Sequence, residues 1–274
     1  MVIVGSMYEE TDVQTYPIDM NYNNEQHRFG QVARQWKLVK PNGEKWESLK
    51  KELIELDLTM DPTMTIYAAG RNVMFARNAD WHEKYTLPSM WDFYTPNREA
   101  HGSYWFDWTT HDEIAWKKFY QVWMQFLGSE MCIRDSVTTG SDSGFIYKLF
   151  GFGYIEELEL LQEAGFHPLE VIRAATLHGA ETLHKPLGTE PDFGLIAPGY
   201  LADLVIVKEN PLANFKVLYG TGAIVVNNEN KPERVGGVDY TIKDGIIFDA
   251  KKLLKDVENM VNKAKREDGE LKKY

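Results

Sequence analysis

The residues best suited to do chemistry lie in one short stretch, 137–144, which reads Val-Thr-Thr-Gly-Ser-Asp-Ser-Gly. Three β-favouring residues run into a glycine, and Asp142 follows between Ser141 and Ser143, as when a buried strand ends at a site. In a parallel α/β barrel, side chains at the carboxyl ends of the strands point into the mouth of the active site. A carboxylate there can bind a divalent metal through oxygen or accept a proton from a metal-bound water. The stretch therefore makes Asp142 a candidate metal ligand and catalytic base.

The same residues also allow a structural interpretation. An aspartate often accepts a hydrogen bond from the backbone amide two residues later, which closes an Asx-turn. In that case the carboxylate of Asp142 would hold the amide of Gly144 and would do no chemistry. The rest of the chain has to decide between the two interpretations.

The bulk composition excludes several classes of protein. With 274 residues, of which 43% are hydrophobic and 26% charged, the chain is expected to form one large domain, or one domain with a small appendage. Its net charge of −11 argues against a nucleic-acid surface, which needs a basic patch. No window approaches the roughly 18 consecutive apolar residues of a membrane span, and we expect no secretory signal peptide at the start. The single cysteine, Cys132, excludes an intrachain disulfide and a cysteine-rich metal site.

The elements that must position the stretch follow an α/β rhythm. Apolar spacing predicts helices from 23 to about 40 and from there to 56, and the β-branched and aromatic residues 63–67 predict a buried strand. Thr110 and Glu113 predict a capping box that opens a helix to about 127. Further helices are expected at 154–164, from 168 and at about 180–183. Strands are expected at 201–207, 223–227 and 239–249, with a hairpin turn at 243–245. A terminal amphipathic helix follows.

Residues 78–110 form an unusually aromatic segment, in which Pro88 and Pro96 argue against a long helix. Long loops of this kind are often lids or binding loops. One interpretation is an aromatic substrate platform, with His101 and Trp105, together with Ser141 and Ser143, as substrate-binding candidates. The other is that the rings simply bury the loop against the domain. No two histidines of this segment have the spacing of a metal site.

Residues 128–136 read Gly-Ser-Glu-Met-Cys-Ile-Arg-Asp-Ser and interrupt the pattern. They resemble a string that recurs in metagenome-derived gene predictions, where sequencing-adapter bases have been translated. On that interpretation Cys132 has no meaning and truncated ends are expected. The alternative is a natural loop between a helix and a strand.

Four segments, in their order and spacing, resemble the amidohydrolase superfamily, especially its imidazolonepropionase-like and prolidase-like branch. They are residues 139–144, 157–165, 168–176 and 194–205. The last contains a Gly-x-Ile-x-Pro-Gly-x-x-Ala-Asp-Leu run, which in this family returns the chain from the barrel to a small β-domain.

The resemblance implies a (β/α)8 barrel that holds one or two divalent metals, commonly zinc. Asp142 matches the aspartate that ends the eighth strand, which binds metal and acts as general base toward the bound water. The implied activity is metal-dependent hydrolysis of C–N bonds in non-peptide or dipeptide-like amides, with a small molecule as substrate. On this basis residues 1–190 would be part of a TIM-type barrel that includes the loop 78–110. Residues 191–274 would supply strands of the small β-domain and a C-terminal helix.

The chain also departs from the family pattern. It contains no H-x-H sequence, and His27 is its only histidine before residue 82. A complete barrel needs roughly 200 residues or more, and the part before the small domain is shorter. We therefore expect a C-terminal fragment, inactive by itself, with the remaining metal ligands upstream.

Two alternatives stay open. One is a non-catalytic binding protein on a degenerate barrel, whose Trp- and Tyr-rich loop holds aromatic or carbohydrate ligands. The other is a genuine short protein. The substrate, the oligomeric state and the cellular compartment are not indicated by the sequence.

Overall fold

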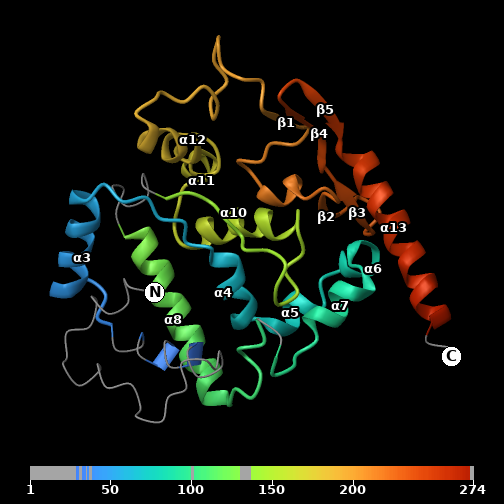
Figure 1. The fold of residues 1–274 in the computed structure, drawn as a ribbon, viewed down its shortest axis with the longest axis horizontal. Coiled ribbons are helices and arrows are strands. Elements are labelled where there is room, and N and C mark those ends of the chain that lie inside the picture. The colour runs from blue at the N-terminus through green and yellow to red at the C-terminus, as the bar shows by residue number, and fades with distance from the viewer. Residues whose placement is uncertain are drawn as a thin grey trace.

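The computed structural model describes residues 29, 30, 33, 34, 36, 39–99, 102–129 and 137–271. They form a mixed α/β structure in which a group of packed helices is followed by two small sheets (Figure 1). The longer helices are α3 (Glu44–Glu55), α4 (Met64–Arg71), α8 (Thr110–Gly128), α10 (Gly153–Glu163), α12 (Leu177–His184) and α13 (Ala250–Leu271). The short ones are α5 (Val73–Arg77), α6 (His82–Tyr85), α7 (Pro88–Tyr94), α11 (Pro168–Ala174), η2 (Lys185–Leu187) and η3 (Phe215–Leu218).

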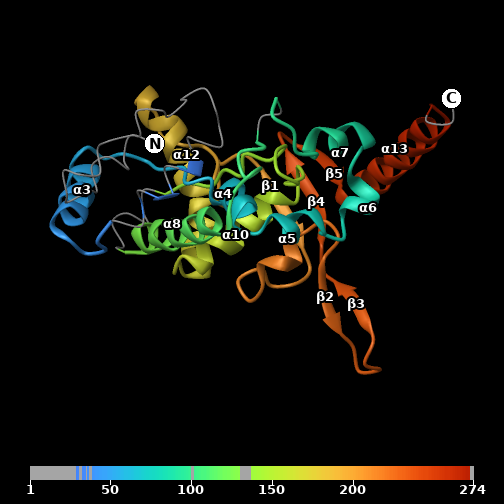
Figure 2. The same cartoon turned by 90° about the horizontal axis from the view of Figure 1, so that it is seen from below.

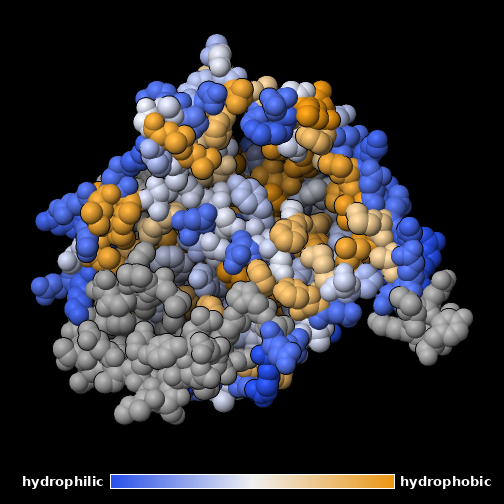
Figure 3. Space-filling view, in the orientation of Figure 1, coloured by the Kyte–Doolittle hydropathy of each residue, from blue (hydrophilic) through white to orange (hydrophobic). Residues whose placement is uncertain are grey.

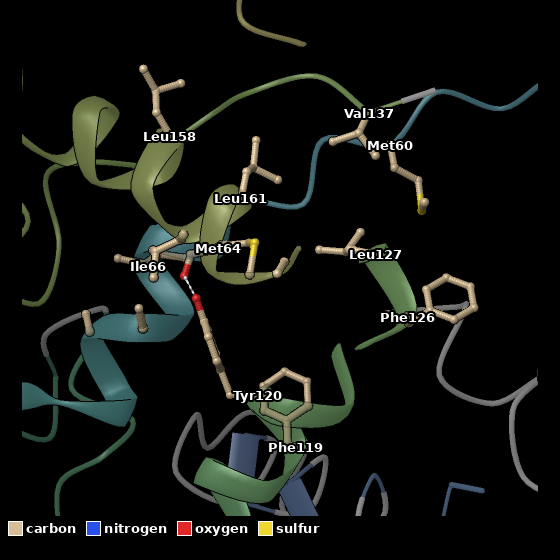
Figure 4. Packing of buried hydrophobic residues seen from close by; sticks show 14 of the residues in the cluster. Met60, Met64, Ile66, Phe119, Tyr120, Phe126, Leu127, Val137, Leu158 and Leu161 are labelled. Atoms are coloured by element: carbon tan, nitrogen blue, oxygen red, sulfur yellow. Dashed lines mark hydrogen bonds between the residues drawn. The ribbon is translucent and has the colours of Figure 1, made fainter. Parts of the chain in front are cut away.

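The core lies where α4 packs between α8 and α10. Apolar side chains from these helices interlock there, among them Tyr120 and Leu127 of α8 and Leu161 of α10, all fully buried (Figure 4). The phenol of Tyr120 donates a hydrogen bond to the carbonyl oxygen of Met64, 3.2 Å away. This contact satisfies a polar group that would otherwise be buried without a partner.

The predicted strand at 63–67 is wrong, because these residues begin helix α4. Thr63 precedes the helix in a left-handed conformation (φ 48°) and makes no side-chain cap. The cap comes instead from α10, where the Glu157 carboxylate accepts hydrogen bonds from the amides of Met64 (2.8 Å) and Thr65 (2.7 Å). A helix start leaves its first amides without intrahelical partners. This long-range cap therefore outweighs the local β preference of the segment.

Most of the other predicted helices are confirmed. Helices α3, α8, α10 and α11 lie where apolar spacing places them, and Gly165 ends α10 with φ at 102°. The capping box of α8 lies one residue earlier than predicted, because Thr109 and Asp112 form it. The reciprocal bonds run from the Asp112 amide to the Thr109 hydroxyl and from the Thr109 amide to the Asp112 carboxylate.

Both sheets are antiparallel. The first sheet has the order β1-β4-β5, in which β1 is Leu204–Val207, β4 is Val238–Lys243 and β5 is Ile246–Asp249. The second sheet pairs β2 (Ala223–Val226) with β3 (Pro232–Val235). Strand β3 was not predicted from the sequence. The predicted turn between β4 and β5 is confirmed, since Asp244 (φ 51°) and Gly245 (φ 75°) both have the positive φ of a type I′ turn. Among the described residues, parallel pairing is limited to one bridge between Met60 and Val137, so they do not show the barrel itself.

The aromatic segment is held against the helices by its own rings. It contains α6 and α7 rather than one long helix, and Tyr94 and Tyr104 are buried. The ring of Trp81 stacks on Phe152 at 4.9 Å and on Tyr219 at 5.6 Å between centroids. For these rings the structure supports packing rather than an open platform.

The β2–β3 hairpin projects away from the body of the protein, and α13 runs outward toward the C-terminus (Figure 2). Hydrophobic surface lies over the region of the three-stranded sheet, where Ile246 and Ile247 of β5 are 58% and 65% exposed (Figure 3). None of the helices in the described ranges is long and apolar enough to cross a membrane.

Candidate functional site

The stretch 137–144 is anchored at its start by Val137, which is fully buried beside Met60 (Figure 4). The two residues form a parallel bridge, and the amide of Thr138 donates to the carbonyl oxygen of Met60 at 2.9 Å. Nδ1 of the buried His178, on α12, lies 3.2 Å from the Val137 carbonyl oxygen, to which it donates. The segment after Val137 therefore leaves the core from a fixed point, as predicted for the end of a buried strand, although the pairing is only one bridge long.

Asp142 is exposed at the surface and has a positive φ of 46°. The pKa of the Tyr67 phenol, on α4, is raised mainly by burial and also by the negative charge of Asp142. The Asx-turn interpretation is not supported, since the amide of Gly144 donates to the carbonyl oxygen of Lys148 at 2.8 Å. The carboxylate of Asp142 is thus not the acceptor for this amide.

The loop that follows Asp142 has unusual backbone geometry. Ile146 (φ 44°) and Tyr147 (φ 60°) both adopt left-handed conformations, which a β-branched residue such as isoleucine rarely takes. Both side chains are buried, and the phenol of Tyr94 donates to the carbonyl oxygen of Lys148 at 3.3 Å. Packing therefore holds this loop in a conformation that its residues would not choose locally, a kind of strain that clusters at functional sites.

The two predicted substrate-binding serines contact each other. Ser141 Oγ and Ser143 Oγ are 2.9 Å apart, and a Cβ on Gly153 would collide with Ser143 Oγ. Next to them, the hydroxyls of Thr139 and Tyr154 are 2.8 Å apart. Burial raises the pKa of the Tyr154 phenol, with smaller contributions from nearby carboxylates. The stretch therefore presents a row of hydroxyl groups beside Asp142.

Trp105 and His101 are the other two predicted substrate-binding residues. Trp105 is half-buried and packs against the hydrophobic core. His101 lies outside the described residues, as does Cys132 with most of the adapter-like string. Of that string, Gly128 ends α8, and Ser129 Oγ donates to the Phe126 carbonyl oxygen at 2.8 Å.

Asp61 is a further carboxylate of the site that sequence reasoning missed. It directly follows Met60, and a Cβ built on Gly140 would come within 2.5 Å of its Oδ2. Thr63 Oγ1 donates to Asp61 Oδ1 at 3.1 Å. The Asp61 carboxylate therefore lies against Gly140, which is two residues before Asp142. Because glycine has no side chain, it leaves the space that this carboxylate occupies. The signal in the sequence is only the Asp-Pro pair at 61–62, which is typical of a turn between elements.

Glu157, on α10, is fully buried. Besides the two amides of α4, it accepts the hydroxyl of Thr65 at 2.6 Å, and that hydroxyl lies 3.1 Å from the Gly153 carbonyl oxygen. Burial raises the pKa of Glu157 to about 7. The hydrogen bonds to Glu157 lower this pKa in part, and the negative charge of Asp61 raises it slightly. A carboxyl group of this kind changes its charge near neutral pH.

The metal expected from the resemblance lacks a complete set of ligands here. In the part of the chain that the structure describes, no three His, Cys, Asp or Glu side chains come together as a metal site would require. Asp142 and Asp61 supply carboxylate oxygens only, whereas protein zinc sites have three or four ligands, commonly with histidine or cysteine among them. The described residues therefore do not by themselves fit a zinc centre.

Comparison with known proteins gives one match. The family model described as "Amidohydrolase family" matches residues 130–246, a segment that contains Asp142, helices α10 to α12 and strands β1 to β4. Neither a curated protein nor a solved structure matches the chain.

Proposed function

We propose that the protein is a hydrolase of C–N bonds in which Asp142 is the catalytic carboxylate, because residues 130–246 match the amidohydrolase family model. The observation that carries the proposal is the position of Asp142. It is exposed at the end of a segment that leaves the core from a parallel bridge, and it lies inside the family-matched part of the chain. Carboxylates at such positions face the site in α/β barrels.

The chemistry assigned to Asp142 is that of a general base. An exposed carboxylate can accept a proton from a water molecule, and the resulting hydroxide adds to the carbonyl carbon of an amide. The C–N bond then breaks, and the amine leaves with a proton. The hydroxyl groups of Ser141, Ser143 and Thr139 are candidates to orient a polar substrate beside it.

Members of this family usually bind metals, and a divalent cation bound near Asp142 would polarise the amide carbonyl and acidify the water. We propose Asp142 as the ligand that this stretch contributes. Its own carboxylate chemistry does not depend on which metal that is. The remaining ligands would come from residues other than those the structure describes.

The alternative of a binding protein that uses the aromatic segment is less well supported. Tyr94 and Tyr104 are buried, and Trp105 packs against the core. These rings have their faces occupied by neighbouring side chains rather than offered to a ligand.

The test is to assay Asp142→Asn in the full-length protein that contains this chain against a panel of dipeptides and cyclic amides, with zinc or manganese added. Removing a general base typically lowers the rate by about 10²- to 10⁴-fold. Asp256→Asn, at an exposed aspartate of α13, is the matched control and should leave turnover unchanged. Undiminished turnover of Asp142→Asn, or no turnover of any amide by the parent protein, would rule the assignment out.

A further inference from the structure

A second site is indicated by a cleft that neither Asp142 nor its neighbouring serines line. The cleft has a volume of about 900 Å³ and lies between α5, α10, η3 and the β2–β3 hairpin. These elements are far apart in the sequence, and the hairpin forms the wall that projects from the body (Figures 1 and 2). The volume is within the range of protein sites for small molecules, which is roughly 300–1,000 Å³.

One side of the cleft is apolar and aromatic. Trp81 and Tyr219, stacked on each other at 5.6 Å between ring centroids, are among the residues that line this side. Phe75 and Ile224, which also line the cleft, are 73% and 59% exposed. Large apolar side chains left open around a concavity are typical of a binding surface.

The floor of the cleft contains a buried ion pair. The Lys148 side chain is only 4% exposed, and its Nζ lies 2.6 Å from both carboxylate oxygens of Glu156. Burying two charges costs desolvation free energy, which their mutual attraction has to offset. An ion pair in such a place is weak evidence for stability, and it makes polar recognition at the floor of the cleft the better explanation.

Other side chains that line the cleft also form ion pairs. Lys216 pairs with Glu159, which also accepts the phenol of Tyr219 at 2.7 Å. Arg234 pairs with Asp80 and donates to the Gly222 carbonyl oxygen at 3.0 Å. The lining thus includes four cationic and four anionic side chains, namely Arg71, Lys148, Lys216, Arg234, Asp80, Glu156, Glu159 and Glu163. Each cation is paired with one of the carboxylates, so the lining is electrically balanced, and a ligand that carries both charges can join these pairs without leaving a net charge.

From this combination we infer that the cleft binds a small zwitterion that carries an apolar or aromatic group, of the size of an amino acid or dipeptide. Phe75 and Ile224 would contact the apolar group, the cations of the lining would receive its carboxylate, and the carboxylates of the lining would receive its ammonium. Purely anionic ligands would face four carboxylates, and purely cationic ones four basic groups. The inference does not depend on the hydrolysis proposed at Asp142.

The test is calorimetric titration of the complete chain with phenylalanyl-glycine and three analogues. N-acetylphenylalanine keeps only the negative charge, phenylalaninamide keeps only the positive charge, and N-acetylphenylalaninamide is neutral. We expect the dipeptide to bind and each analogue to bind at least about tenfold more weakly, which corresponds to about 1.4 kcal/mol. The inference is overturned if no binding occurs up to about 10 mM dipeptide, or if the neutral analogue binds equally well.

Two matched pairs of variants locate the binding. Lys216→Met removes a cation at the cleft, whereas Lys208→Met removes a lysine that is 80% exposed and outside it. Ile224→Ser removes an apolar side chain of the cleft, whereas Val226→Ser changes the same strand two residues away, outside the lining. We expect at least fivefold weaker binding for the first member of each pair and less than twofold change for the second. Equal effects within both pairs would show that the dipeptide binds elsewhere.

Discussion

Replacing Glu157 by glutamine should change how the stability of the protein depends on pH. Glu157 is fully buried, and burial raises its pKa from the ordinary value of 4.5 to about 7. The folded state therefore binds the proton more tightly than the unfolded state does. The stabilisation is complete below pH 4.5 and is lost as the pH rises through about 7.

The magnitude follows from the size of the shift. One pKa unit corresponds to 1.36 kcal/mol, so the contribution amounts to about 3 kcal/mol between pH 4.5 and pH 8. Solvent screening does not reduce it, because no part of the residue is exposed. Glutamine cannot titrate, but it keeps one oxygen for the amides of Met64 and Thr65. We expect the difference in free energy of unfolding between the parent and Glu157→Gln to change by about 2.5 kcal/mol in favour of the variant between pH 5 and pH 8.

Urea unfolding followed by tryptophan fluorescence at pH 5, 6, 7 and 8 measures this directly. Glu52→Gln, at an exposed glutamate of α3, serves as the matched carboxylate-to-amide control. The observable is the difference in free energy of unfolding between parent and variant at each pH, because other titrating groups cancel in it. If that difference stays constant within about 1 kcal/mol across the series, Glu157 is not the titrating group that we describe.

Two further predictions concern stability. His82 is buried, with its ring nitrogens 2.9 Å from the Ala76 carbonyl oxygen and 2.8 Å from Thr86 Oγ1, and burial lowers its pKa. The stability that it contributes is present above about pH 6.5 and lost as the pH falls, so the difference between His82→Gln and parent should shrink below pH 6 in the same urea assay. Gly128→Ala should destabilise the protein by about 2 kcal/mol or more, because the new methyl would collide with the Ala164 carbonyl oxygen at the end of α10. Gly179→Ala on α12 has open space around it and should instead stabilise by about 0.5–1 kcal/mol, so equal melting temperatures for the two variants would contradict the packing described.

Local features of the sequence predicted the parts of the fold that depend on local interactions. The type I′ turn at Asp244 and Gly245, the end of α10 at Gly165 and the start of α11 at Pro168 each follow from one or two residues. Helix α4 was mistaken for a strand because its cap, Glu157, lies 92 residues away from Thr65. No window of sequence contains both residues.

The candidate site divides in the same way. Asp142 and its serines were recognised because the signal lies within eight residues and resembles a family motif. Asp61 was missed because the parallel bridge of Met60 with Val137 brings it against Gly140, and residue spacing does not reveal that bridge. The substrate-platform interpretation of the aromatic segment depended on exposure, and the sequence could not show that Tyr94 and Tyr104 are buried.

The hydrogen bonds between Glu157 and the first turn of α4 also connect the stability of the protein to the candidate site. Glu157 fixes the first turn of α4, and Thr63, just before that turn, donates to the carboxylate of Asp61. Asp61 in turn lies against Gly140, two residues before Asp142. A change in the charge of Glu157 near neutral pH therefore acts on the segment that places Asp61 beside the stretch 137–144. Glu157→Gln leaves one oxygen in place of two for the first amides of α4, so it should disturb the backbone around Gly140, whereas Glu52→Gln should leave it unchanged.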